Sequence, residues 1–286
     1  MALQQQDEDD LEENEPLIVL TGEHTAIHSN SSEEFIEART VLQHDPWDVN
    51  AWLIFLEEAE VGKGGDISDV SAYQQFLLKF PRAARFWKRL AELQLSSGDF
   101  VSAGETLSSG AKQCWNVPLW DYYLDFLISN VSSYSSEKLQ EAFEGSLEQI
   151  GFAHDSTGVW KKFLHHIQSG VDKGVCDINY LRSMYLKALN VPLENSDSIF
   201  ADYEKFERTI QDPNFESYIA EGQKRFLHSK SILKERKKFV QEIVFERLSL
   251  PPSNTPNELS QLQLWNEWLR YCSIILFSIL EFNCCC

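Results

Sequence analysis

The side chains in this sequence that could do chemistry are concentrated in one basic segment, between residues 224 and 238. Its cations are Lys224, Arg225, Lys230, Lys234, Arg236, Lys237 and Lys238, and the one acid among them is Glu235. Clustered cations can bind RNA phosphates or an acidic protein, but long basic side chains also cover apolar surface on a solvated helix. The segment lacks interleaved surface aromatics that could stack bases, so sequence-specific reading of RNA is not expected. Both interpretations of the segment stay open.

The other reactive side chains do not form a recognisable site. His165 and His166 are adjacent, and neighbours on a helix do not face the same way, so they are not expected to share a metal. Glu57, Glu92 and Asp125 recur at equivalent places of a repeat, which favours a structural role over catalysis. The sequence has no Gly-rich phosphate loop, G-x-S-x-G, H-E-x-x-H or kinase motif. We therefore expect no enzymatic activity, no cofactor and no metal.

A repeated element must position these side chains. Tryptophans at positions 52, 87, 120 and 160 are 35, 33 and 40 residues apart, and each opens a phrase with an apolar residue three places later. Similar phrases begin at Phe200 and, after 65 residues, at Trp265. A period of this length is typical of stacked two-helix units. We interpret the first aromatic of each phrase as a core anchor between two helices, which gives Trp52, Trp87, Trp120, Trp160, Phe200 and Trp265.

A second type of helix follows these phrases. Between Val70 and Phe80, apolar residues at spacings of three and four form one stripe along a helix. The segments 139–150 and 181–189 have the same pattern, and Gly or Pro follows each within a few residues. The sequence therefore predicts an all-α fold, a superhelical array of antiparallel helix pairs of the TPR-like α-solenoid type.

The same pattern predicts the domain organisation. Residues 1–32 are acidic and poor in large apolar side chains, which predicts a disordered tail. Residues 33–250 form the repeat array, which ends in a long helix over about 215–248. A hinge is expected at 251–260, where three prolines disfavour helix, and a second array begins within 261–286.

Composition narrows the function classes. The net charge is −19, from 44 acids against 25 Lys and Arg, which argues against nucleic-acid binding by the whole molecule but not by a local patch. The six cysteines form no C-x-x-C pair, so a reducing compartment, the cytosol or nucleus, is the simpler interpretation. The longest apolar run, 271–280, is too short to span a bilayer.

The repeat resembles the half-a-TPR (HAT) repeat, which has Trp and a second aromatic in its first helix and Pro after its second. Four phrases make the chain similar to the suppressor-of-forked family, which includes the large scaffold subunit of cleavage stimulation factor. They lie at residues 80–88, 117–123, 235–243 and 251–256. The last two are the more specific, because they lie outside the generic repeat and keep the family's order. The matches cover roughly residues 33–271.

This resemblance implies a non-enzymatic nuclear scaffold of mRNA 3′-end cleavage and polyadenylation, which holds other processing subunits by protein–protein contacts. The family also implies homodimerisation through the second array. From Cys272 the sequence departs from the family pattern and ends in three cysteines. We interpret this as a C-terminally truncated form whose dimerising region is largely missing. The alternatives are a splicing-related HAT scaffold, or a direct RNA-binding module that uses the 224–238 helix.

Overall fold

The computed structural model describes residues 32–63, 67–130, 136–210, 212–244, 250–252 and 254–284, and within these residues all regular structure is helical. The chain divides into two compact units, Met1–Lys79 and Phe80–Cys286. The first contains α1 (Glu33–His44), α2 (Val49–Glu60) and α3 (Asp69–Lys79). The second contains α4 (Ala84–Ser96), α5 (Phe100–Gln113), α6 (Val117–Ser129), α7 (Ser136–Ile150), α8 (Thr157–Asp172), α9 (Ile178–Asn190), α10 (Ser196–Ile210), α11 (Phe215–Val240) and α12 (Pro256–Cys284).

Short polar side chains start several of these helices. The carboxylate of Asp48 accepts a hydrogen bond from an amide in the first turn of α2, and Asp99 and Asn116 do the same for α5 and α6. Ser32 caps α1 in the same way. Apart from Ser32, the acidic tail expected over residues 1–32 lies outside the described residues.

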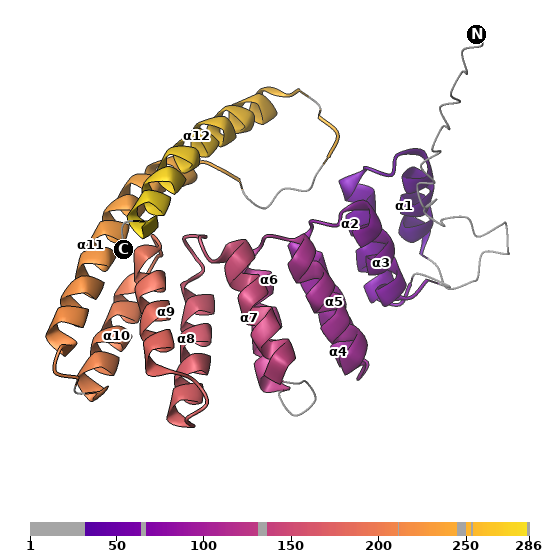
Figure 1. Ribbon diagram of the computed structural model, residues 1–286. Coiled ribbons are helices and arrows are strands. Elements are labelled where there is room, and N and C mark those ends of the chain that lie inside the picture. The colour runs from indigo at the N-terminus through magenta and orange to yellow at the C-terminus, as the bar shows by residue number, and fades with distance from the viewer. Residues whose placement is uncertain are drawn as a thin grey trace, which may run out of the picture. The chain divides into compact units, whose positions relative to one another are not determined.

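The prediction of an all-α array of antiparallel helix pairs is confirmed. In the second unit the helices that carry the repeat phrases alternate with their partners as α4/α5, α6/α7, α8/α9 and α10/α11, which lie side by side in Figure 1. Buried apolar side chains form one continuous cluster from Ala91 on α4 to Phe226 on α11. Because each pair buries its apolar face against its neighbours, the pairs stabilise one another.

Three of the expected anchors, Trp52, Trp120 and Trp160, are almost completely buried. Their indole N–H groups need acceptors, since an unpaired buried donor is costly. Trp52 donates to the carbonyl of Pro46 at 2.9 Å, and Trp160 donates to the carbonyl of Gly151 at 2.8 Å. Each of these bonds joins the helix to the turn that precedes it.

The other anchors are only half-buried. Trp87 donates its indole N–H to the carbonyl of Pro81 at 2.8 Å, which repeats the six-residue spacing of the Trp52 bond. Phe200 stacks on Phe226 of α11, with ring centroids 5.0 Å apart. On α12 the buried aromatic is Trp268, whereas Trp265 is half-buried.

Two boundaries near the hinge differ from the expectation. The long helix α11 ends at Val240, not near residue 248, and residues 245–249 are outside the described part of the chain. The helix α12 begins at Pro256, inside the hinge expected at 251–260. The reason is a capping box, in which the Glu258 amide donates to Thr255 Oγ1 at 3.4 Å and the Thr255 amide donates to the Glu258 carboxylate at 3.3 Å. Proline fits the first turn after such a cap.

A bilayer-spanning segment is not found among the helices that the structure describes, since none combines sufficient length with sufficient apolarity.

Candidate partner-binding surface on helix α11

The basic segment lies on α11, which packs against α9 and α10. Its inner face carries Phe226, Ser229 and Leu233, spaced three and four residues apart. Gly222 belongs to the same face, because a Cβ atom there would clash with the ring of Tyr203 on α10. Gly222 therefore allows α10 and α11 to pack closely.

Three of the seven predicted cations form ion pairs that hold α11 in place or support its own helix. Arg225 binds Glu221 on the same helix at 2.8 Å. Lys230 binds Asp197 at the start of α10 at 2.6 Å, and this hydrogen bond lowers the pKa of the Asp197 carboxyl group. Lys237 binds Glu194, in the loop between α9 and α10, at 3.1 Å. These side chains are directed toward the protein's own carboxylates.

Arg236 is a fourth inward cation. Its Nη1 donates to the carbonyl of Phe152, in the loop before α8, at 2.9 Å. Its guanidinium lies 5.1 Å from the ring centroid of Trp268 on α12. Burial lowers the pKa of Arg236. Through this one side chain α11 contacts both an earlier loop and the helix that follows it.

The remaining cations, Lys224, Lys234 and Lys238, are exposed. Lys234 and Lys238 make no ion pair with any carboxylate of the described residues. At spacings of ten and four residues the three lie on one side of α11, together with Leu227, which is 57% exposed. The predicted seven therefore separate into four that contact the protein's own groups, three of them outside α11, and three that face solvent.

A buried ion pair was missed by sequence reasoning. Arg182 on α9 makes two hydrogen bonds to the Glu207 carboxylate on α10, at 2.6 and 3.0 Å. Its guanidinium also lies 4.1 Å from the ring centroid of Tyr218 on α11, so it joins three helices. Glu207 falls on the apolar face of α10, four residues after Tyr203, and that placement is the sequence signal that could have revealed it.

The acids that recur at equivalent places of the repeat lie in different surroundings. Asp125 on α6 binds Lys162 on α8 at 2.7 Å, and this pair links neighbouring repeats. Glu92 instead pairs within α4, with Lys88 at 3.9 Å and Arg89 at 3.5 Å. These acids bind lysine and arginine in the described structure.

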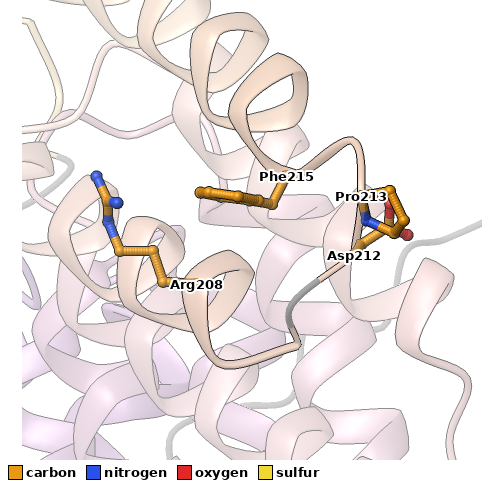
Figure 2. A pocket seen from close by; sticks show the side chains of 4 residues that line it. All are labelled: Arg208, Asp212, Pro213 and Phe215. Atoms are coloured by element: carbon orange, nitrogen blue, oxygen red, sulfur yellow. The ribbon is translucent and has the colours of Figure 1, made fainter.

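A shallow hollow lies where α10 passes into α11. Figure 2 shows Arg208 on α10 and Phe215 at the start of α11 beside it, with Asp212 and Pro213 on the connecting loop. Arg208 is paired with Glu204 at 2.6 Å, and the described residues that line the hollow include no second basic or nucleophilic group. Within the described residues no group of three or more His, Cys, Asp or Glu is placed to hold a metal ion.

Comparison with known proteins shows which family this repeat array resembles. The family model described as "Suppressor of forked protein (Suf)" matches residues 33–273. "Cleavage stimulation factor subunit 77" of Arabidopsis thaliana is 28% identical over 206 residues, which cover 70% of this chain and 28% of that protein. "Protein suppressor of forked" of Drosophila melanogaster is 24% identical over 245 residues, which cover 84% of this chain and 32% of that protein.

A fungal relative matches a comparable share of the chain at lower identity. "mRNA 3'-end-processing protein rna14" of Schizosaccharomyces pombe is 21% identical over 243 residues, which cover 82% of this chain and 33% of that protein. The chain thus spans about a third or less of the length of these relatives.

Proposed function

The chain belongs to the Suppressor of forked family, and on this basis we propose that it is a non-enzymatic scaffold in the formation of mRNA 3′ ends. The observation that carries the proposal is the family match over residues 33–273, on a chain whose described part is a helical-repeat array. Relatives bear the names of a cleavage stimulation factor subunit and of mRNA 3'-end-processing proteins.

The proposed mechanism is positional. A continuous core from α4 to α11, with the buried Arg182–Glu207 pair across α9 and α10, makes the second unit a stiff support. Factors bound at separate places on a stiff support meet at a high effective concentration, because their encounter becomes intramolecular. The scaffold would thus act by fixing the distance between bound processing factors.

The proposed partners are other cleavage and polyadenylation subunits, and the proposed compartment is the nucleus. The exposed side of α11 with Lys224, Leu227, Lys234 and Lys238 is a candidate contact for one of them. Its cations and its exposed leucine suit an acidic protein surface with an apolar centre. RNA phosphates are the second candidate for the same side chains.

Affinity purification of the tagged chain from nuclear extract tests the proposal. We expect recovery of cleavage and polyadenylation factors, and recovery of spliceosomal proteins in their place would refute it. A matched chain with Lys234→Gln and Lys238→Gln tests the α11 surface, since both side chains are exposed and neither forms an ion pair with a carboxylate of the described residues. If this variant recovers every factor as well as the wild type does, α11 is not a partner contact.

A further inference from the structure

A second basic surface lies on the first two turns of α4 and the loop before it. Arg82, Arg85, Lys88 and Arg89 are all exposed, and the first acid that follows them is Glu92. Lys88 and Arg89 contact Glu92 on the same helix, at 3.9 and 3.5 Å. Arg82 and Arg85 form no ion pair with a carboxylate of the described residues. In a chain with a net charge of −19, this local cationic excess is notable.

Arg82 and Arg85, at the start of α4, do not stabilise this helix. The first turn of α4 has no acidic residue, and Ala83 supplies no side-chain cap. Cations near a helix N-terminus oppose the helix dipole, where Asp and Glu are favoured. Their placement on α4 therefore calls for an explanation outside the helix itself.

An exposed tryptophan lies next to this basic surface. Trp115, in the loop between α5 and α6, is 76% exposed. Its position is well defined, because the buried Cys114 donates its thiol to the carbonyl of Pro81 at 3.4 Å and Asn116 caps α6. Since Pro81 directly precedes Arg82, this bond brings the tryptophan loop beside the α4 cations.

The end of α5 carries a further exposed cation, but on another side of the helix pair. Lys112, exposed in the last turn of α5, is three residues before Trp115. The α4 and α5 helices pack so closely that a Cβ atom on Gly110 would meet the Trp87 side chain at 2.6 Å. Lys112 follows Gly110 by two residues, about 200° around α5, so it faces away from α4. The surface beside the start of α4 therefore consists of Arg82 and Trp115, in two loops, and Arg85 in the first turn of α4, and we call it the Trp115 surface.

We propose that the Trp115 surface binds single-stranded RNA, with one base stacked on the indole of Trp115 and phosphates held by Arg82 and Arg85. Single-strand binding sites combine cations that follow the backbone with aromatic rings on which bases stack. An acidic peptide would use the cations but has no need for a flat exposed ring. The choice of RNA over other single strands rests on the proposed function, whereas the surface chemistry does not depend on it.

Fluorescence anisotropy of a labelled oligouridylate with the full chain, at low salt and then over a salt series, tests the proposal. Trp115→Ala should weaken binding about tenfold, the typical effect of removing one base stack. Arg82→Gln with Arg85→Gln should lower the slope of log affinity against log salt by about 1.4, or about 0.7 for each phosphate of a single strand that is no longer neutralised.

Matched controls separate this surface from general charge and aromatic content. Lys187→Gln with Lys205→Gln removes the same charge from exposed positions on α9 and α10, and Phe100→Ala removes an aromatic that is 55% exposed at the other end of α5. Both controls should bind within about twofold of the wild type. Unaltered binding by Trp115→Ala, or no binding by the wild type at low salt, would overturn the proposal.

A second readout distinguishes the failure of this inference from the failure of the scaffold function. The Trp115→Ala chain is used in the nuclear-extract purification, where it should recover the same proteins as the wild type while it binds RNA weakly. Loss of a protein factor with unchanged RNA affinity would assign the surface to a protein partner and refute RNA binding there. Recovery of no processing factor by the wild type would refute the scaffold proposal without bearing on the oligonucleotide result.

Discussion

Substituting Arg182 with alanine would leave the Glu207 carboxylate buried without its cation. Glu207 is 0% exposed and Arg182 is 11% exposed, so water can replace little of the missing interaction. Removing one partner of a buried ion pair costs about 3–5 kcal/mol, because the other charge stays desolvated. The substitution also removes the guanidinium from the Tyr218 ring, 4.1 Å away, which adds about 0.5–2 kcal/mol. We take about 4 kcal/mol as the expected destabilisation.

Thermal unfolding followed by circular dichroism at 222 nm measures this destabilisation. For a unit of about 200 residues, 1 kcal/mol lowers the melting temperature by roughly 2–4 °C, so the expected decrease is about 8–16 °C. The chain provides a matched control in Arg208 and Glu204, which are also 2.6 Å apart but are 59% and 37% exposed. Arg208→Ala should cost less than about 0.5 kcal/mol.

A double substitution isolates the buried charge. Arg182→Met combined with Glu207→Met removes both charges and fills the space with apolar side chains, a change that is often neutral or stabilising. It should therefore be more stable than Arg182→Ala by several kcal/mol. Equal melting temperatures for Arg182→Ala and Arg208→Ala would refute the reasoning, since burial would then have no effect on the cost.

Three further predictions follow from single side chains. Burial lowers the pKa of His166 below its ordinary value of 6.5. The unfolded chain therefore binds the proton first as the pH falls, and the free energy of unfolding decreases from about pH 7 until the folded-state pKa is passed. Between pH 7.5 and pH 5, the melting temperature of His166→Gln should therefore fall less than that of the wild type. Burial raises the pKa of the Cys114 thiol to about 11, from an ordinary 9.0. At pH 8, alkylation of Cys114 in the native protein should therefore be at least about 100-fold slower than in urea, as measured by peptide mass spectrometry. Equal rates would contradict its burial. Thr255→Ala removes the cap of α12 and should cost about 1 kcal/mol, seen as about fivefold faster amide hydrogen exchange in the first turn of α12 and unchanged exchange in α5.

The helical repeat was predictable because Trp phrases and apolar stripes are local patterns. Each phrase lies within one helix, and the Pro and Gly residues around it act on their own segment. The error at the start of α12 arose at the same local scale. The three prolines predict a non-helical hinge, whereas Thr255 and Glu258 form a capping box around Pro256. Proline is compatible with the first position of a helix after such a cap.

The candidate surfaces were less predictable because they depend on contacts between distant segments. That Lys237 pairs with Glu194, and Arg236 with the Phe152 carbonyl, follows from how α11 crosses earlier loops, which the order of residues does not reveal. The Trp115 surface likewise combines residues from one helix and two loops. Its strongest signal, the 76% exposure of Trp115, cannot be read from a sequence in which Trp52, Trp120 and Trp160 are core residues.

The contact between Arg236 and Trp268 is the point about which a rotation of α12 on α11 would displace the ends of α12. Around this contact Phe239 and Tyr271 stack at 4.4 Å, so α12 is held on α11 near the middle of its length. A helix of 29 residues is about 43 Å long. A rotation of about 10° at the Arg236 contact would therefore swing an end about 20 Å away by some 3–4 Å. A small adjustment where the guanidinium meets the indole would thus be magnified at the ends of α12, and any factor bound there would move with it.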